Sequence, residues 1–218
     1  MKRPRDQTEL TEALGAEGIE RLRPSMRVRA IRPGEFLYFE AQAAEHLWVV
    51  RSGEVRTLKT SPSGRVTTLE LVRPGGLFGM AAIVADAQYT DSAQAIAAGE
   101  VWSVRQKAVA AALRERPAAG RALLGIVARR LQTAHDRLCS FANDSVTARL
   151  AQTVLEEAEG DRIELTRRIL GESAGTTVET TIRILRGFER EGWIEGGVGW
   201  IRILDRDALE AAAQGEKR

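Results

Sequence analysis

Apolar and polar residues alternate in short runs between about residues 24 and 105, and this alternation predicts β-strands. Turn-forming pairs separate the runs, among them Pro33-Gly34, Ser52-Gly53 and Pro74-Gly75. No helical periodicity of useful length interrupts the region. Because short strands at such spacing are typical of an antiparallel barrel or jelly roll, we expect a β-roll here.

The apolar pattern becomes helical between about residues 118 and 143. Apolar side chains recur there at steps of three and four, an a/d seam made up of Leu124, Val127, Leu131, Ala134, Leu138 and Phe141. Arg130 and Arg137 flank this seam on one edge. A seam this regular predicts that two copies of the helix pack side by side in a parallel dimer. The alternative is a helix that packs its apolar stripe on its own β-roll.

From Ser145 onward the pattern predicts several short helices and a hairpin. Thr166 is a suitable cap for one short helix, and Gly175 supplies a turn in a conformation that favours glycine. Thr176 or Thr177 then caps a second helix. Residues 192–204 form two short strands joined by glycines, so the segment is interpreted as a helix-turn-helix followed by a wing.

The second of these helices carries two stripes. One is apolar and faces inward, and the opposite one comprises Val178, Glu179, Ile182, Arg183 and Arg186. Arg183 can donate two hydrogen bonds to guanine, and Glu179 can accept one from cytosine. Val178 or Ile182 can contact a thymine methyl group. We therefore expect the first four residues of this stripe to read base edges.

Other polar side chains of this region suit the DNA backbone, whose phosphates set the register without specifying sequence. The candidates for phosphate contacts are Arg167, Arg168, Thr177 and Arg186. The whole chain of 218 residues has a formal net charge of only +2, and acidic residues outnumber basic ones after Ser145. A DNA-binding surface must therefore be a local patch.

Composition also limits the cellular setting. Cys139 is the single cysteine, which excludes an internal disulfide and fits a reducing cytoplasm. The N-terminus is charged and lacks an apolar core, and no apolar run approaches the roughly 20 residues of a membrane span. We expect a cytoplasmic protein without a membrane partner.

The chain resembles the CRP/FNR family of bacterial transcription regulators over nearly its whole length. The resemblance is carried by "RPGEFLYFEAQAAEHLWVVRSGEVRTLKTSPSGR", "LVRPGGLFGMAAI", "ARRLQ", "SVTARLAQTVL" and the helix-turn-helix. It implies an α+β fold with a cyclic-nucleotide-binding-like β-roll (1–117, with a short N-terminal helical segment), a dimerisation helix and hinge (118–144) and a winged helix-turn-helix (145–218). It also implies a homodimer on near-palindromic double-stranded DNA, with RNA polymerase as a partner.

The positions that bind cAMP in one branch of this family are altered. Met80 stands where that branch has a ribose-binding Glu, Tyr89 stands at the phosphate-binding Arg, and Thr90 keeps the neighbouring hydroxyl. Ala134 and His135 match the positions that contact adenine. The stretch 74–104 contains no Lys or Arg, so a buried phosphate there would be poorly compensated. We expect no cAMP binding in the usual manner, and Met80, Tyr89, Thr90 and His135 remain candidates for an effector pocket.

The reading helix resembles the FNR pattern "TVET", which implies a TTGAT-like half-site, although Ile182 departs from that pattern and leaves the exact half-site open. One cysteine cannot ligate an iron–sulfur cluster within a subunit. The effector stays open between haem or a gas sensor with His46 or His135 as axial ligand, another small ligand, a redox switch on Cys139, and none. No cofactor or metal site is predicted, because His135 and Cys139 are only two ligands.

Two other function classes compete with DNA-dependent regulation. The chain could be a ligand- or haem-sensing regulatory module that acts through protein partners, with the helix-turn-helix as a docking surface. An enzyme is disfavoured because the sequence has no phosphate-binding loop, no metal-ligand cluster and no Ser/His/Asp grouping that can be placed in one site.

Overall fold

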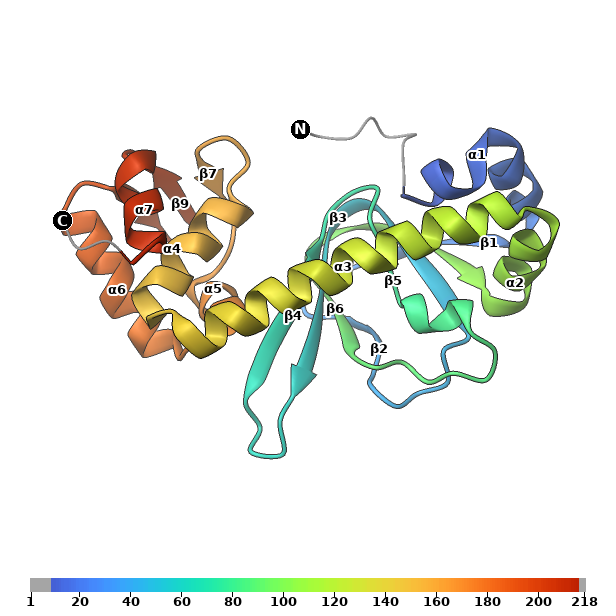
Figure 1. Cartoon of the computed structure of the whole chain (residues 1–218), viewed down its shortest axis with the longest axis horizontal. Helices are drawn as coiled ribbons and strands as arrows, with labels where there is room; N and C mark the ends of the chain where they lie inside the picture. Colours follow the sequence, from blue (N-terminus) through green and yellow to red (C-terminus); the bar gives the residue numbers. More distant parts are fainter. Residues whose placement is uncertain (1–8, 216–218) are drawn as a thin grey trace. The chain divides into compact units, whose positions relative to one another are not determined.

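The computed structural model describes residues 9–215 (Figure 1). The chain divides into two compact units, the first ending at Leu131 and the second beginning at Gln132. The boundary falls inside the long helix α3 (Pro117–Asn143), which therefore contributes to both units. Among the described residues, no helix is both long enough and apolar enough to cross a membrane.

The first unit is an antiparallel β-roll, as the alternating pattern predicted. Its main path of paired strands is β1-β6-β3-β4, with β2 paired to β6 and β5 paired to β3. The strands are β1 (Met26–Ile31), β2 (Phe36–Tyr38), β3 (His46–Thr60), β4 (Val66–Val72), β5 (Leu77–Phe78) and β6 (Ser92–Arg105). The core between them contains Leu47, Val49, Leu77, Phe78 and Val101, each at most 1% exposed.

Ser52-Gly53 is not the turn that the sequence suggested. The pair lies within β3, which runs on through it while its register with β6 shifts. Gly53 has φ of 75°, and a Cβ there would lie 2.6 Å from the carbonyl oxygen of Ala98 on β6. The glycine therefore forms a bulge that bends one continuous strand where two backbones approach closely.

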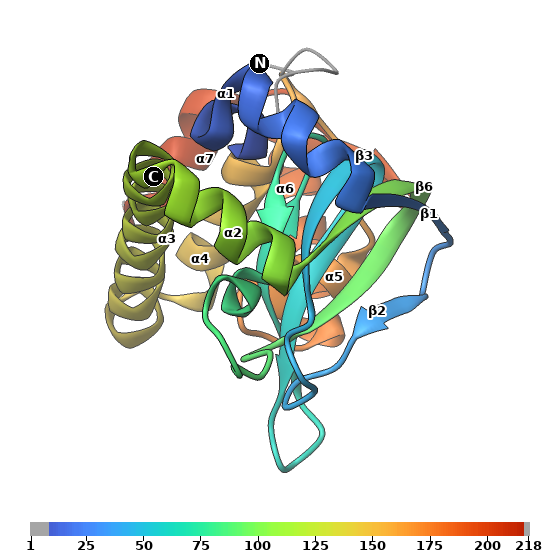
Figure 2. The same cartoon turned by 90° about the vertical axis from the view of Figure 1, so that its right-hand side faces the viewer.

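Helices cover one end of the roll. They are α1 (Glu9–Leu22) and α2 (Gln106–Glu115), which lie side by side (Figure 2). The sequence pattern did not indicate α2 as a separate helix. It ends at Glu115 because Arg116, the residue before Pro117, is disfavoured in helical conformation, and α3 then begins with that proline.

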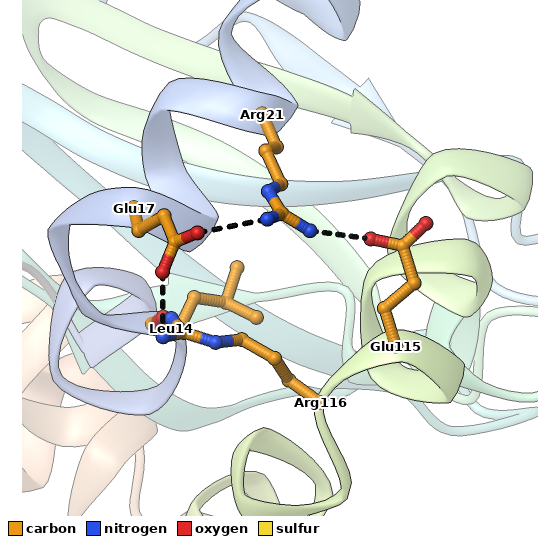
Figure 3. Close-up of polar contacts among 5 residues, drawn as sticks. All are labelled: Leu14, Glu17, Arg21, Glu115 and Arg116. Carbon is orange, nitrogen blue, oxygen red and sulfur yellow. Dashed lines mark hydrogen bonds and ion pairs between the residues drawn. The ribbon is translucent and has the colours of Figure 1, made fainter.

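A polar network ties α1 to the junction between α2 and α3 (Figure 3). Arg21 donates hydrogen bonds to Glu17 at 2.8 Å and to Glu115 at 3.1 Å. Gly15 interrupts α1 with φ of 69°, and Arg116 donates to the carbonyl of the preceding residue, Leu14. The arginine thus satisfies a carbonyl at the point where the helix is interrupted.

The second unit is a small helical domain with a three-stranded sheet in the order β7-β9-β8. Its elements are α4 (Val146–Glu157), β7 (Arg162–Ile163), α5 (Arg167–Ser173), α6 (Val178–Arg190), β8 (Ile194–Gly197), β9 (Trp200–Ile203) and α7 (Arg206–Ala213). Ser145 caps α4 by accepting a hydrogen bond from the Ala148 N–H. The hairpin of β8 and β9 is the predicted wing.

Candidate nucleic-acid interface and effector cavity

The helix-turn-helix forms with the predicted local chemistry. Thr166 caps α5 by accepting a hydrogen bond from the Ile169 N–H at 3.3 Å. Gly175 forms the turn with φ of 66°. Thr177 is the cap of α6 and accepts from the Thr180 N–H at 3.2 Å, which decides between the two candidate threonines. Each cap satisfies a backbone donor that the helix cannot satisfy itself.

Close packing fixes α5 against α6. A Cβ on Gly171 of α5 would lie 2.4 Å from Oγ1 of Thr181, a residue of α6 that is fully buried. The hydroxyl of Thr181 donates to the Thr177 carbonyl one turn earlier, which leaves it little room to move. Only glycine at 171 permits this approach of the two helices.

The two stripes of α6 separate as predicted. Ile184, Leu185 and Phe188 are buried, at 8%, 1% and 4% exposure. The opposite stripe lines an open depression on the surface, formed by Glu179, Ile182, Arg183, Arg186, Glu189 and Arg190. Val178 and Ile182 are half-buried, whereas Glu179, Arg183 and Arg186 are exposed. The charged groups at the centre of this stripe therefore face solvent.

The charge state of this stripe suits hydrogen bonding to bases. Its own backbone N–H and, second, the Thr177 side chain favour the ionised form of Glu179 and lower its pKa. Glu179 is therefore an ionised acceptor at neutral pH. Within residues 9–215, neither Arg183 nor Arg186 forms a hydrogen bond or an ion pair. Both guanidinium groups are free to donate to an external acceptor.

The four candidates for phosphate contacts differ in availability. Arg168 and Arg186 are exposed. Arg167 is half-buried, lies 3.4 Å from a Glu189 carboxylate oxygen and donates to the Trp200 carbonyl at 3.4 Å; burial lowers its pKa. Arg167 thus links α5 to α6 and to the wing, so its guanidinium is already used inside the domain. The Thr177 hydroxyl is exposed but serves as the cap.

The predicted dimer seam is exposed in the single chain. Leu124, Leu131 and Leu138 are 67%, 54% and 66% exposed. A different stripe of α3, made up of Ala119, Leu123 and Ile126, is buried in the core of the β-roll. The helix therefore packs on its own roll with one face and presents a second apolar face to solvent. Ala134 is also exposed, and Val127 is half-buried.

Phe141 has a second role that the seam pattern did not reveal. A Cβ on Gly175 would lie 2.5 Å from the ring of Phe141, so the ring rests against the turn of the helix-turn-helix. The guanidinium of Arg149 lies 5.3 Å from the centre of the same ring and donates to the Ala174 carbonyl. The last turn of α3 is thereby attached to the helix-turn-helix.

Three of the four predicted pocket residues lie together. Met80, Tyr89 and Thr90 line a cavity of about 190 Å³ in the first unit, with Thr57, Glu70, Phe78, Gly79, Ala81, Asp91, Val127 and Arg130. His135 is exposed on α3 and is not among the lining residues of this cavity, so its place in an effector pocket stays a prediction. Of the residues of α3, Val127 and Arg130 line the cavity, whereas Ala134 and His135, farther along the helix, are not among its lining residues.

Tyr89 is held firmly in the wall of this cavity. Its hydroxyl donates to the His46 carbonyl at 2.7 Å and accepts from the Trp48 indole N–H at 3.1 Å. Its ring stacks on Tyr38, with the ring centres 3.7 Å apart. Burial raises the pKa of Tyr89, so the hydroxyl remains a neutral donor at physiological pH. The side chain therefore occupies fixed space rather than offering a charge to a ligand.

The cation of the cavity comes from outside the stretch 74–104. No Lys or Arg lies between residues 74 and 104, yet Arg130 reaches the cavity from α3. Arg130 is 3.2 Å from Glu9 and 3.3 Å from Glu70, and it donates to the Leu77 carbonyl at 2.5 Å. Two carboxylates already neutralise this guanidinium. The sequence pattern places Arg130 beside the seam, but only the fold brings it to the pocket.

Known proteins resemble both units. Residues 28–116 match the cyclic nucleotide-binding domain family, and residues 148–212 match the Crp-like helix-turn-helix domain family. The chain belongs to the CRP/FNR family of transcription regulators. Members of this family regulate transcription by binding DNA and are not enzymes.

Individual relatives agree with this assignment. The chain is 28% identical over 201 residues to the HTH-type transcriptional regulator Cmr of Mycobacterium tuberculosis, covering 92% of this chain and 82% of the relative. It is 26% identical to the cyclic AMP receptor protein of Thermus thermophilus, covering 94% and 97%. The structure of FixK2 from Bradyrhizobium japonicum shares the fold, with a TM-score of 0.79 at 24% identity and coverage of 88% and 98%.

Proposed function

We propose that this CRP/FNR regulator acts as a cytoplasmic homodimer that reads a near-palindromic DNA site with α6 of each subunit. The observation that carries the proposal is the exposed stripe of α6, on which Arg183 and Arg186 have no partner within the described residues while Glu179 is ionised. Val178, Glu179, Ile182 and Arg183 are proposed to read bases. Arg168 and Arg186 are proposed to contact phosphates. Thr177 and Arg167 are proposed as weaker phosphate contacts, because their polar groups already bond inside the domain.

The exposed apolar face of α3 supports a dimer. Leu124, Leu131 and Leu138 recur at the heptad spacing on a surface that a monomer would leave in water. Two copies packed along this face would present two reading helices to one DNA duplex. A symmetric protein of this kind requires a site with matched half-sites. The resemblance of the "TVET" pattern to FNR proteins favours a TTGAT-like half-site.

The N-terminal cavity supports control by something other than cAMP in the usual manner. The resemblance to the cAMP-responsive branch of the family places Met80 and Tyr89 at its ribose-binding and phosphate-binding positions. Arg130 is the cation of the cavity and is already paired with Glu9 and Glu70. A cyclic phosphate would have to displace those carboxylates. RNA polymerase is the proposed partner at the promoter, as for the family.

DNA selection from a random library tests the proposal. The purified full chain should enrich a site with two inverted half-sites about one helical turn apart, and its affinity should fall steeply with salt. Sedimentation should show that Leu131→Glu is a monomer. Its affinity for the selected site should fall by about 100-fold or more, because the two α6 helices no longer bind DNA as parts of one dimer. The matched control, Gln132→Glu, adds the same charge one residue away and should remain dimeric.

Two results would contradict the proposal. One is a wild-type protein that enriches no sequence, and the other is a Leu131→Glu protein that remains dimeric and binds the selected site normally. Salt-insensitive capture of a protein partner through α6, without DNA binding, would instead support the alternative of a module that acts through protein partners.

A further inference from the structure

The cavity of the β-roll has the size of a small organic molecule. Its volume is about 190 Å³, and a cavity of roughly 150 Å³ lined by apolar side chains is known to accommodate benzene. Part of its wall is apolar, contributed by Phe78, Met80, Ala81 and Val127. A ligand with an apolar body about the size of one substituted ring therefore fits the space and the wall.

The charges around the cavity favour a ligand that is not an anion. Two carboxylates, Glu70 and Asp91, and one guanidinium, Arg130, line it. Glu70 lies 3.3 Å from Arg130, and the same guanidinium also meets Glu9 at 3.2 Å. An entering anion would find its one lining cation shared between two carboxylates, and a third negative charge close by on Asp91.

The Asp91 carboxylate can accept further hydrogen bonds or form an ion pair. It accepts one hydrogen bond, from the Tyr38 hydroxyl at 3.0 Å, and forms no ion pair within residues 9–215. Its side chain is only partly accessible, and burial raises its pKa. A cation placed in the cavity would supply that compensation.

We propose that this cavity binds a compact organic amine, with its apolar body against Phe78, Met80 and Val127 and its ammonium group paired with Asp91. This ligand class differs in charge and size from a cyclic nucleotide. The inference goes beyond the DNA-reading function and does not depend on it, because the wall of the cavity belongs entirely to the β-roll unit and the first part of α3.

Three probes on one scaffold test the charge preference: benzylamine, benzyl alcohol and benzoate, with cAMP as the fourth. Each is titrated into the full-length protein by calorimetry. We expect benzylamine to bind about tenfold more tightly than benzyl alcohol, because a charge-assisted hydrogen bond replaces a neutral one. Benzoate and cAMP should bind more weakly still. Asp91→Asn should remove the tenfold preference, whereas Asp86→Asn, the same change at an exposed position outside the cavity, should not.

A second measurement needs no variant and locates the binding site. The chain has three methionines, of which Met80 lines the cavity and Met26 lies in β1. In the methyl spectrum of protein labelled at methionine, benzylamine should shift the Met80 signal and leave the Met26 signal in place. Assignment by Met80→Leu, a change of similar volume, identifies the signal.

Three outcomes would overturn the proposal: no benzylamine binding at millimolar concentration, tighter binding of benzoate or cAMP, or a Met80 signal that does not move. DNA selection with the same preparation separates this failure from a failure of the proposed function. A protein that selects an inverted repeat but ignores benzylamine refutes only the amine site, and one that binds benzylamine but selects no DNA refutes only the reading function.

Discussion

The proposed reading face of α6 (Val178, Glu179, Ile182, Arg183 and Arg186) and the cavity of the β-roll both contain arginine, but their arginines are in opposite situations. Arg183 and Arg186 are exposed and have no partner within the described residues. Arg130 is three-quarters buried, pairs with Glu9 and Glu70 and donates to a carbonyl. The first two can bind an anion without losing anything, whereas the third would first have to give up two carboxylates.

The difference teaches that the availability of a cation, not its presence, decides whether a site accepts phosphate. Exposed guanidinium groups gain from a phosphate mainly through released counterions and charge-assisted hydrogen bonds. A guanidinium that is already compensated in a partly buried network gains little, and leaves carboxylates without a partner. Loss of an α6 arginine should therefore affect DNA binding alone, and loss of Arg130 should affect stability alone.

The largest expected effect is that of Arg183→Ala. Loss of a bidentate bond to a base should weaken binding to the selected DNA by roughly 1–3 kcal/mol in each half-site, while the melting temperature and the dimer remain unchanged. Gel-shift titration and sedimentation of the same sample measure both. Arg190→Ala, an exposed arginine at the end of the same helix, is the control and should retain sequence preference. If Arg183→Ala bound the selected DNA with unchanged affinity, the proposal that Arg183 contacts a base would be wrong.

A glycine pair tests whether packing behind the reading face matters as much as the face itself. Gly171→Ala places a Cβ 2.4 Å from Oγ1 of buried Thr181 and should lower the free energy of unfolding of the second unit by about 1–3 kcal/mol. Gly187→Ala meets no atom within 4 Å and should raise it by up to about 1 kcal/mol. Denaturant titration distinguishes them, and equal effects would show that α5 and α6 are not packed as described.

The cavity side of the comparison is tested by Arg130→Gln. Because Glu9 and Glu70 lose their shared cation, the free energy of unfolding of the β-roll should fall by about 1–2 kcal/mol. Arg51→Gln breaks an ion pair with Glu100 that is more exposed and should change stability by less than about 0.5 kcal/mol. If Arg130→Gln instead left stability unchanged and altered DNA specificity, the two arginine environments would not differ as proposed.

The smallest expected effect separates the two arginines at the start of α5. Arg168→Ala should reduce the slope of binding against salt by about one for each phosphate that the side chain no longer neutralises, with little change in sequence preference. Arg167→Ala should leave the slope nearly unchanged but destabilise the unit, because its guanidinium bonds to Glu189 and Trp200. DNA binding measured over a series of salt concentrations gives the slope for each variant. Equal slopes for both variants would mean that Arg167 leaves its internal partners to bind DNA.

The helix-turn-helix was predictable almost residue by residue, because the parts that build it are close in sequence. The caps Thr166 and Thr177, the turn at Gly175 and the buried stripe of α6 all act within one or two helical turns, and periodicity reports them directly. The strand pattern likewise predicted an antiparallel roll. It misplaced a turn at Ser52-Gly53, because the sequence pattern does not distinguish a glycine that bends a strand from a glycine that ends one.

The sequence by itself determined most of the helices and strands, which face of α6 is polar, and the apolar seam of α3. Only the tertiary structure decided what surrounds the cavity. Its walls come from β3, β4, β5, α3 and the segments 79–81 and 89–91, so Glu70, Asp91 and Arg130 are brought together across segments that are far apart in the chain. Local patterns do not predict such long-range contacts, since the sequence around a charged residue does not show whether its side chain contacts a residue on another segment or water.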